Sequence, residues 1–204
     1  MTAIVDIYNM AVMEVGHSTA ITDPNENTNA ANLCRTFYPM CRDMVLESIN
    51  WKFATKRVTL SLLPGKQTNW EYAYAYPADG LFIQAIVRPG MRKPPKEHEV
   101  PFEIGNMDGA RVILTDMPQA EAIYTVRVEN PNLFTQLFTS ALVYQLASKV
   151  AAPLTGKAEM AANARAGYQL MLGHAAAANL NEAADGPDPD CEFVAIRGTG
   201  GSYA

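Results

Sequence analysis

The sequence predicts an α+β protein in which N- and C-terminal helices form a bundle, an antiparallel β-lobe is inserted between them, and a flexible C-terminal arm follows. Two observations predict this class. Apolar residues recur at helical spacing towards both ends of the chain, whereas in the middle they alternate with polar residues, as they do in strands. We expect the helical lobe to comprise residues 1–57 and 130–183, the inserted β-lobe residues 58–129, and the arm residues 184–204.

Two helices are expected before the strands. The first spans residues 3–15, because its apolar side chains share one face and Gly16 can end it in the left-handed conformation. The second is expected to begin at residues 24–28 and to run to about residue 50, since the order Asp-Pro-Asn-Glu at 23–26 is typical of a helix N-terminus. Pro39 lies within it and removes one backbone hydrogen bond, which predicts a kink or a division into two helices.

The middle of the chain predicts six short strands that form an antiparallel sheet or a small barrel. Their apolar and polar residues alternate, and turn sequences such as Ala78-Asp79-Gly80 separate them. The expected strands are VTLSL, WEYAYAY, LFIQAIV, PFEI, ARVILT and AIYTVRV. A proline-rich loop of mixed charge, residues 88–99, is expected to project from this lobe.

Helical spacing returns after the strands. Asn130 and Pro131 are a suitable cap and first-turn pair, and residues 133–151 are apolar on most of the helix circumference up to Pro153. Such a helix must be covered on several sides. An alanine-rich helix is expected over residues 157–180, where small residues such as Gly167 allow neighbouring helices to approach closely.

Composition and charge narrow the class of function. With 204 residues and 49% hydrophobic residues, the chain can bury a core as one domain or two joined lobes. The net charge of -5 argues against tight wrapping of DNA, which needs clustered Lys and Arg. Neither a leader sequence nor a run of eighteen apolar residues occurs, so we expect folding in a cytoplasm and no membrane contact.

The residues that carry chemistry are scattered. The cysteines, Cys34, Cys41 and Cys191, fit neither a disulfide framework nor a zinc site, and the first two are expected to be free thiols buried on one helix face. The three histidines stand in different elements, and the glycine-containing segments at 64–68 and 197–202 do not match a phosphate-binding loop. We therefore predict no catalytic, cofactor-binding or metal-binding residues and expect that the protein is not an enzyme.

One stretch, RDMVLESINWKFATKR at residues 42–57, carries a resemblance to a known family. Together with the helix that ends near Gly16, the residues Tyr74, Pro77 and Asp79, and the segment 142–155, it resembles the tail tubular protein A or head-to-tail adaptor (portal-docking) family of short-tailed phages. The similarity covers roughly residues 7–156. The chain has Ile49-Asn50-Trp51 where many relatives carry His-Pro-Trp, and its last helix and tail show no likeness to the family.

The resemblance implies a structural virion protein of the tail or neck that is assembled in the host cytoplasm. Such a subunit forms a homo-oligomeric ring, commonly of twelve copies, which joins the portal protein to the distal tail (nozzle) protein. DNA passes through the channel of the ring without tight specific binding. No cofactor is implied.

The resemblance also assigns an interlobe junction to Trp51, Phe53 and Arg57. The two aromatic side chains are expected to lock the helix end against the sheet, while Lys52, Lys56 and Arg57 point towards acidic groups on the lobe or on a neighbouring subunit. That the aromatic side chains fill the core of this chain is favoured over a direct partner contact.

The C-terminal segment predicts a portal-docking arm. Its acidic, proline-containing part cannot bury enough apolar surface to hold itself in place, and a short apolar cluster follows it. An extended segment there could add as a strand to a sheet edge, or the terminus could be frayed without a partner. The docking residues are Phe193, Val194, Ile196 and Arg197.

Three other functions stay open. A neck or tail-completion protein of a long-tailed phage would use the same ring physics with other partners. A virion-associated peptidoglycan-cleaving enzyme would need paired carboxylates such as Glu47 and Glu71, but nothing in the sequence brings them into one cleft. A DNA-binding protein is the third, with the tyrosine-rich strand as a stacking surface.

Overall fold

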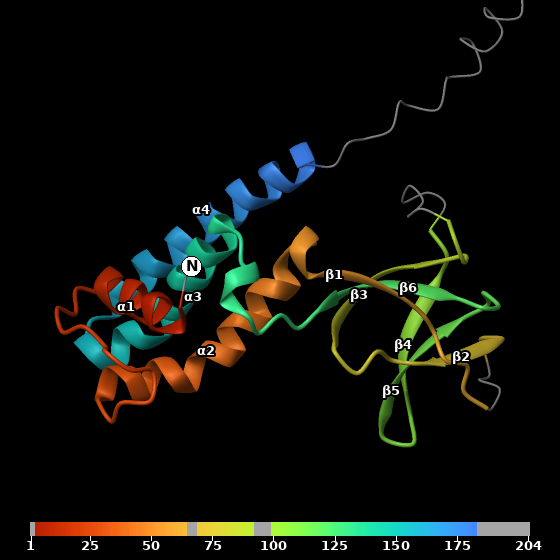
Figure 1. Ribbon diagram of the computed structural model, residues 1–204, viewed down its shortest axis with the longest axis horizontal. Coiled ribbons are helices and arrows are strands. Elements are labelled where there is room, and N and C mark those ends of the chain that lie inside the picture. Colours follow the sequence, from red (N-terminus) through yellow and green to blue (C-terminus); the bar gives the residue numbers. More distant parts are fainter. Residues whose placement is uncertain (1–2, 65–68, 92–98, 183–204) are drawn as a thin grey trace, which may run out of the picture.

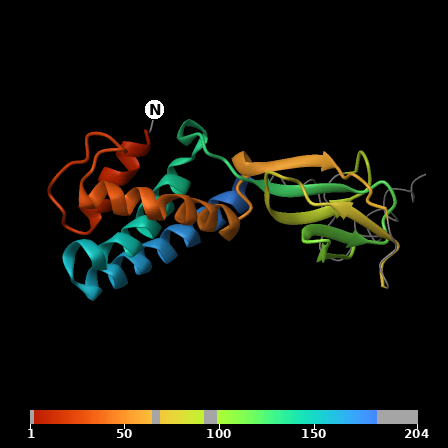
Figure 2. The ribbon, with the colours of Figure 1, turned by 90° about the horizontal axis from the view of Figure 1, so that it is seen from below.

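The computed structural model describes residues 3–64, 69–91 and 99–182, and within these ranges the fold is α+β, as predicted. It contains four α-helices and two small antiparallel sheets. Figures 1 and 2 show an elongated molecule with the helices in one lobe and the strands in the other. The predicted arm, residues 184–204, lies outside the described residues. No helix in the described ranges has both the length and the apolar character needed to cross a membrane.

The helical lobe is organised around the third helix. Its helices are α1 (Ile4–Glu14), α2 (Asn29–Ser48), α3 (Gln136–Thr155) and α4 (Ala158–Glu182). Helix α3 contacts each of the other three, and side chains such as Phe138, Leu142 and Leu146 are fully buried. This confirms the inference that an apolar helix of this kind needs cover on several sides.

The start of α2 differs from the prediction. The helix begins at Asn29, where the Thr28 hydroxyl accepts a hydrogen bond from the Ala31 amide at 3.3 Å. The predicted Asp-Pro-Asn-Glu signature forms a preceding turn instead, because the Glu26 carboxylate accepts hydrogen bonds from the amide and hydroxyl of Thr22 and from the Thr28 hydroxyl. The helix then runs through Pro39 without dividing, so the two-helix alternative is wrong.

The start of α3 was also predicted too early. Asn130 and Pro131 do act as a cap pair, but for a short 3-10 helix, Pro131–Leu133. A second capping residue, Thr135, accepts from the Phe138 amide at 3.3 Å and begins α3 at Gln136. The helix then continues through Pro153 to Thr155.

The described residues of the β-lobe form six strands, which equals the predicted number. They are β1 (Thr55–Thr59), β2 (Tyr72–Ala75), β3 (Gly80–Val87), β4 (Phe102–Met107), β5 (Ala110–Thr115) and β6 (Glu121–Val126). They form two antiparallel sheets, with strand orders β1-β6-β3 and β2-β5-β4. Strand β1 begins before the expected boundary at residue 58, because Thr55 and its neighbours pair with β6.

One hydrophobic core runs through both lobes. Tyr74 and Ile113 from one sheet and Ile86 from the other belong to the same buried cluster as Leu46 of α2 and Phe138 of α3. A smaller cluster on the β2-β5-β4 sheet contains Ala73, Val112 and Leu114. The lobes are therefore joined through packed side chains as well as through the two chain crossings that follow α2 and β6.

The two described cysteines are buried free thiols, as predicted. Cys34 and Cys41 both lie in α2. Burial raises the pKa of Cys34 to about 12 and that of Cys41 to about 11, so both thiols stay protonated and unreactive at neutral pH. Cys191 lies outside the described residues.

Candidate functional site: the junction between the lobes

Trp51 is anchored to the end of the helix that precedes it, α2. Helix α2 ends at Ser48, and the chain then turns into a short 3-10 helix, Lys52–Ala54. The indole N–H donates to the carbonyl of Val45 at 2.7 Å, and the side chain is only 4% exposed. The aromatic ring therefore covers the last turn of α2 and satisfies one of the carbonyls that a helix C-terminus leaves without a partner.

Phe53 joins Trp51 in a cluster of four aromatic rings. Both rings pack edge-on against Phe138 of α3, with centroid distances of 5.2 Å for Trp51 and 5.1 Å for Phe53. Phe134, which precedes α3, lies 4.5 Å from Phe138. Edge-to-face pairs of this kind stabilise beyond the area that they bury. The cluster fastens the start of α3 to the junction between α2 and β1.

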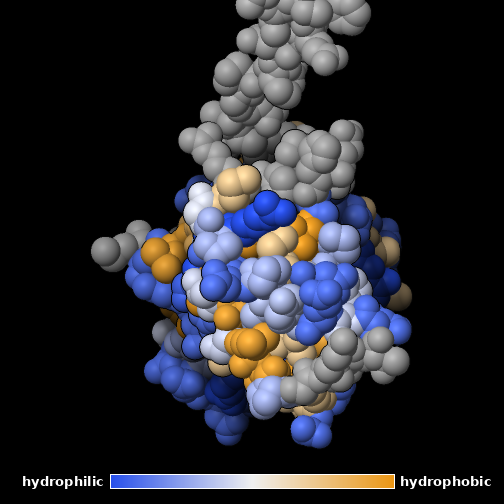
Figure 3. Space-filling model, turned by 90° about the vertical axis from the view of Figure 1, so that its right-hand side faces the viewer, coloured by the Kyte–Doolittle hydropathy of each residue, from blue (hydrophilic) through white to orange (hydrophobic). Residues whose placement is uncertain are grey.

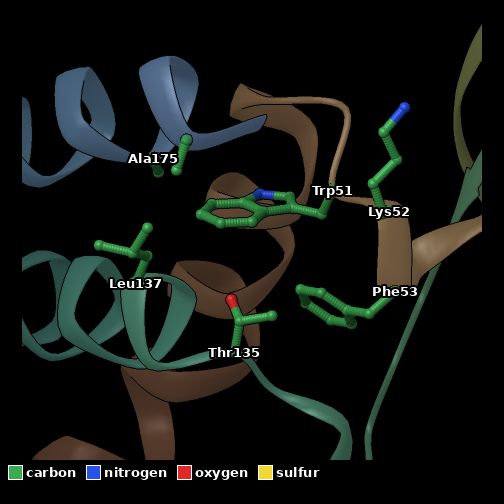
Figure 4. A pocket seen from close by; sticks show the side chains of 7 residues that line it. Trp51, Lys52, Phe53, Thr135, Leu137 and Ala175 are labelled. Carbon is green, nitrogen blue, oxygen red and sulfur yellow. The ribbon is translucent and has the colours of Figure 1, made fainter. Parts of the chain in front are cut away.

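The last helix also reaches this junction. Figure 4 shows the indole of Trp51 between Ala175 of α4 and Leu137 of α3, with Phe53 beside it and Lys52 directed away. A cavity of about 70 Å³ remains among these side chains. It has room for a few water molecules, whereas sites for cofactors and drug-sized ligands measure about 300–1,000 Å³. Its lining comprises Trp51, Lys52, Phe53, Thr135, Leu137, Ala175 and Ala178.

The basic residues after Trp51 pair with acidic residues of the β-lobe. The Lys56 ammonium lies 2.8 Å from the Asp79 carboxylate, and the Arg57 guanidinium lies 2.5 Å from Glu121. The hydrogen bond from Lys56 holds the pKa of Asp79 below its usual value, and the Tyr124 hydroxyl donates to the same carboxylate at 2.9 Å. Burial, assisted by Asp79, raises the pKa of Tyr124 to about 12.

Arg57 does not lie at the contact between the lobes. Its guanidinium donates to the carbonyls of Met91 at 2.6 Å and Arg88 at 3.2 Å, in addition to its ion pair with Glu121. It therefore holds the end of β3 and the turn after it against β1 and β6. The structure thus brings Trp51 and Phe53 together and places Arg57 in a different contact.

The junction also contains a network of charged residues that was not predicted from the sequence. Asp43 accepts hydrogen bonds from the Nε atoms of Arg42 at 2.9 Å and of Arg127 at 3.0 Å. Arg42, which is only 7% exposed, also faces Glu129 at 3.6 Å. This network ties α2 to the segment that follows β6. An adjacent Arg-Asp pair on a helix was visible in the sequence, but partners more than eighty residues away were not.

The contacts at the junction hold the two lobes together. They comprise the aromatic packing of Trp51 and Phe53 on Phe138 and ion pairs such as that between Arg127 and Asp43. Among the residues that the structure describes, no group of three or more His, Cys, Asp or Glu side chains could hold a metal ion. The predicted docking residues Phe193, Val194, Ile196 and Arg197 lie outside the described residues.

Comparison with known proteins gave no match, either to a family model or to a curated protein.

Proposed function

We propose that the chain is a structural virion protein, a head-to-tail adaptor whose copies form a ring between the portal protein and the distal tail (nozzle) protein of a phage. The ring surrounds the DNA channel, and twelve copies are expected from the resemblance. The DNA passes through without tight specific binding, in keeping with the net charge of -5.

The position of the resembling residues carries this proposal. The stretch 42–57 comprises the end of α2, the 3-10 helix and the start of β1, which is the junction between the lobes. Within it, Asp43 binds Arg127, Trp51 packs on Phe138, and Lys56 pairs with Asp79. The residues that carry the resemblance thus specify how two lobes are joined. Subunits of a ring must share one arrangement of their lobes, and residues that fix this arrangement are therefore consistent with membership of an adaptor family.

Exposed apolar side chains give further support. A single exposed apolar residue is ordinary, but large apolar side chains grouped in one patch mark a contact surface. Figure 3 views the molecule from the β-lobe end and shows hydrophobic side chains grouped among hydrophilic ones. The large exposed apolar residues of the described β-lobe are Val58, Leu62, Phe82, Met91 and Ile104.

Binding to the portal tests the proposal. The purified chain is mixed with assembled portal rings from the same phage and separated on a density gradient. We expect the chain to sediment with the portal at a fixed ratio of copies, and to remain near the top of the gradient in a control without portal. A chain that stays at the top in the presence of excess portal would overturn the proposal. Sedimentation with the neck of a long-tailed phage instead would assign it to that assembly.

A further inference from the structure

A groove runs between α1 and the first half of α3 in the helical lobe. Its volume is about 510 Å³. On the α1 side, Asp6 and Glu14 stand at the two ends, with Met10 and Met13 between them. Both methionines are exposed, at 38% and 58% of their surface. The α3 side consists of Gln136, Thr139, Ser140, Val143 and Tyr144.

The charge pattern of the groove indicates what would fit in it. Asp6 and Glu14 are eight residues apart in a helix, or about 12 Å along its axis. The surface between them is apolar, and the methionines can adapt their shape to a partner. A complementary segment has an apolar side chain that can lie between the methionines and a positive charge that can face one of the carboxylates.

The β-lobe presents a segment of this kind after β3. The Met91 amide donates to the carbonyl of Arg88 at 3.1 Å, which closes a turn with Gly90 in the left-handed region at φ +76°. Arg57 donates to the carbonyls of Arg88 and Met91 and so fixes this turn on the sheet. The Met91 side chain is 58% exposed. Arg88, which is also exposed, begins the same turn, so the turn presents a basic side chain and an apolar one together.

The groove and the turn cannot meet within one copy. Figure 1 shows α1 and α3 in the helical lobe and β3, which leads into the turn, in the lobe at the opposite end. Complementary surfaces at different places on one molecule make a head-to-tail contact, which repeats from copy to copy and closes into a ring when the rotation allows it.

We infer that the Arg88–Met91 turn of one copy docks in the α1/α3 groove of a second copy, with the Met91 side chain between Met10 and Met13 and the Arg88 side chain facing Glu14. This contact rests on the proposed function, because it supplies the contact between copies that a ring requires. It also gives Arg57 a role, which is to hold the turn in the conformation that docks.

Photo-cross-linking tests the contact. Benzoylphenylalanine is placed at position 91, and a mixture of ¹⁵N-labelled and unlabelled chains is irradiated, both as concentrated free protein and with portal. We expect dimers whose linked peptides carry one label each and join position 91 to Met10 or Met13. The same probe at Leu170, which is 58% exposed on α4, is the matched control. No dimer above this control in either sample, or links that map elsewhere, would overturn the inference.

A charge exchange gives an independent readout. Arg88→Glu and Glu14→Arg should each lower the dimer yield about tenfold, because each places like charges together, and the double variant should recover most of it. Equal losses in the single and double variants would contradict the pairing.

The two proposals can fail separately. Portal binding with no link from position 91 overturns this contact alone. Links without portal binding overturn the adaptor function and leave the contact between copies.

Discussion

Trp51 and Phe53 are placed as a junction between lobes requires. Two contacts hold the Trp51 side chain in place. Its indole N–H donates to the carbonyl of Val45, and its ring packs on Phe138. Phe53 is only partly buried but packs on the same ring of Phe138. Trp51 therefore belongs to the buried core of this chain, and Phe53 packs against that core.

Truncation of Trp51 should destabilise the whole chain. Trp51→Ala removes a buried ring that touches α3 and α4, and such changes cost about 3–5 kcal/mol. Trp51→Phe keeps most of the packing and loses the hydrogen bond to Val45, so it should cost less. Urea unfolding measures both. Unchanged stability together with lost assembly in Trp51→Ala would move this residue to an interface between subunits.

Glu26 should make the stability of the chain dependent on pH in the acid range. Hydrogen bonds from the Thr22 amide, the Thr28 hydroxyl and the Thr22 hydroxyl lower the pKa of Glu26 from 4.5 to about 2. A lowered pKa contributes stability above the unfolded value and loses it as pH falls through the folded value. The wild type should therefore exceed Glu26→Gln in stability at pH 6, and the difference should shrink between pH 4.5 and about 2. A difference that stays constant over that window would contradict this account.

Among the elements, α4 packs closely against α3 at Gly167, where α4 has no side chain. A Cβ atom added at Gly167 would come within 2.7 Å of the Tyr144 ring. The sequence predicted this close approach from the small residues of the helix. It did not predict which residue of α3 would fill the space, because that depends on how the two helices are rotated.

Two glycines of α4 should respond in opposite ways to alanine. Alanine stabilises a helix interior by about 1 kcal/mol relative to glycine. Gly173→Ala should show this gain, since nothing lies within 4 Å of the added atom. Gly167→Ala should instead lower the melting temperature, because the Tyr144 ring must move and lose its packing. Equal stabilisation by both changes would show that the ring moves aside freely.

Sequence patterns predicted the types of the elements better than their starts. The strands were predictable because the alternation of apolar and polar residues is a local signal, and strands β2, β3, β5 and β6 each contribute buried residues to the sheets. Helices α2 and α3 begin later than predicted because two capping sites lie close together in each case, and contacts between side chains favour the later one. The Glu26 hydrogen bonds to Thr22 and Thr28 and the packing of Phe134 on Phe138 are such contacts.

At the scale of the whole molecule, the sequence predicted some residues of the junction between the lobes but not their partners. Trp51 and Phe53 were found because aromatic residues at a helix-to-strand transition are a local signal. Arg127, Phe138 and Ala175 were missed because they reach the junction through the fold, from segments far along the chain. The contacts of Arg57 were not predicted for the same reason, because its partners Arg88 and Met91 lie in the turn after β3.

The C-terminal segment should be dispensable for folding and needed for docking. Deletion of residues 184–204 removes no residue of the described core, so the melting temperature should change little. Attachment to the portal should weaken strongly, because the apolar cluster at 193–196 is proposed to bind there. Replacement of the same segment by a Gly/Ser linker of equal length is the matched control and should bind as weakly as the deletion. Full occupancy of portals by the truncated chain would end the docking-arm proposal.

Electron microscopy of the chain mixed with its portal decides whether the chain is an adaptor. We predict that the purified chain alone scatters light as a monomer or a weakly associated species, and that images of the mixture show an added ring on one end of the portal, with one copy bound per site. Bare portals in the presence of saturating chain, or a stable closed ring of the chain without portal at micromolar concentration, would contradict this prediction.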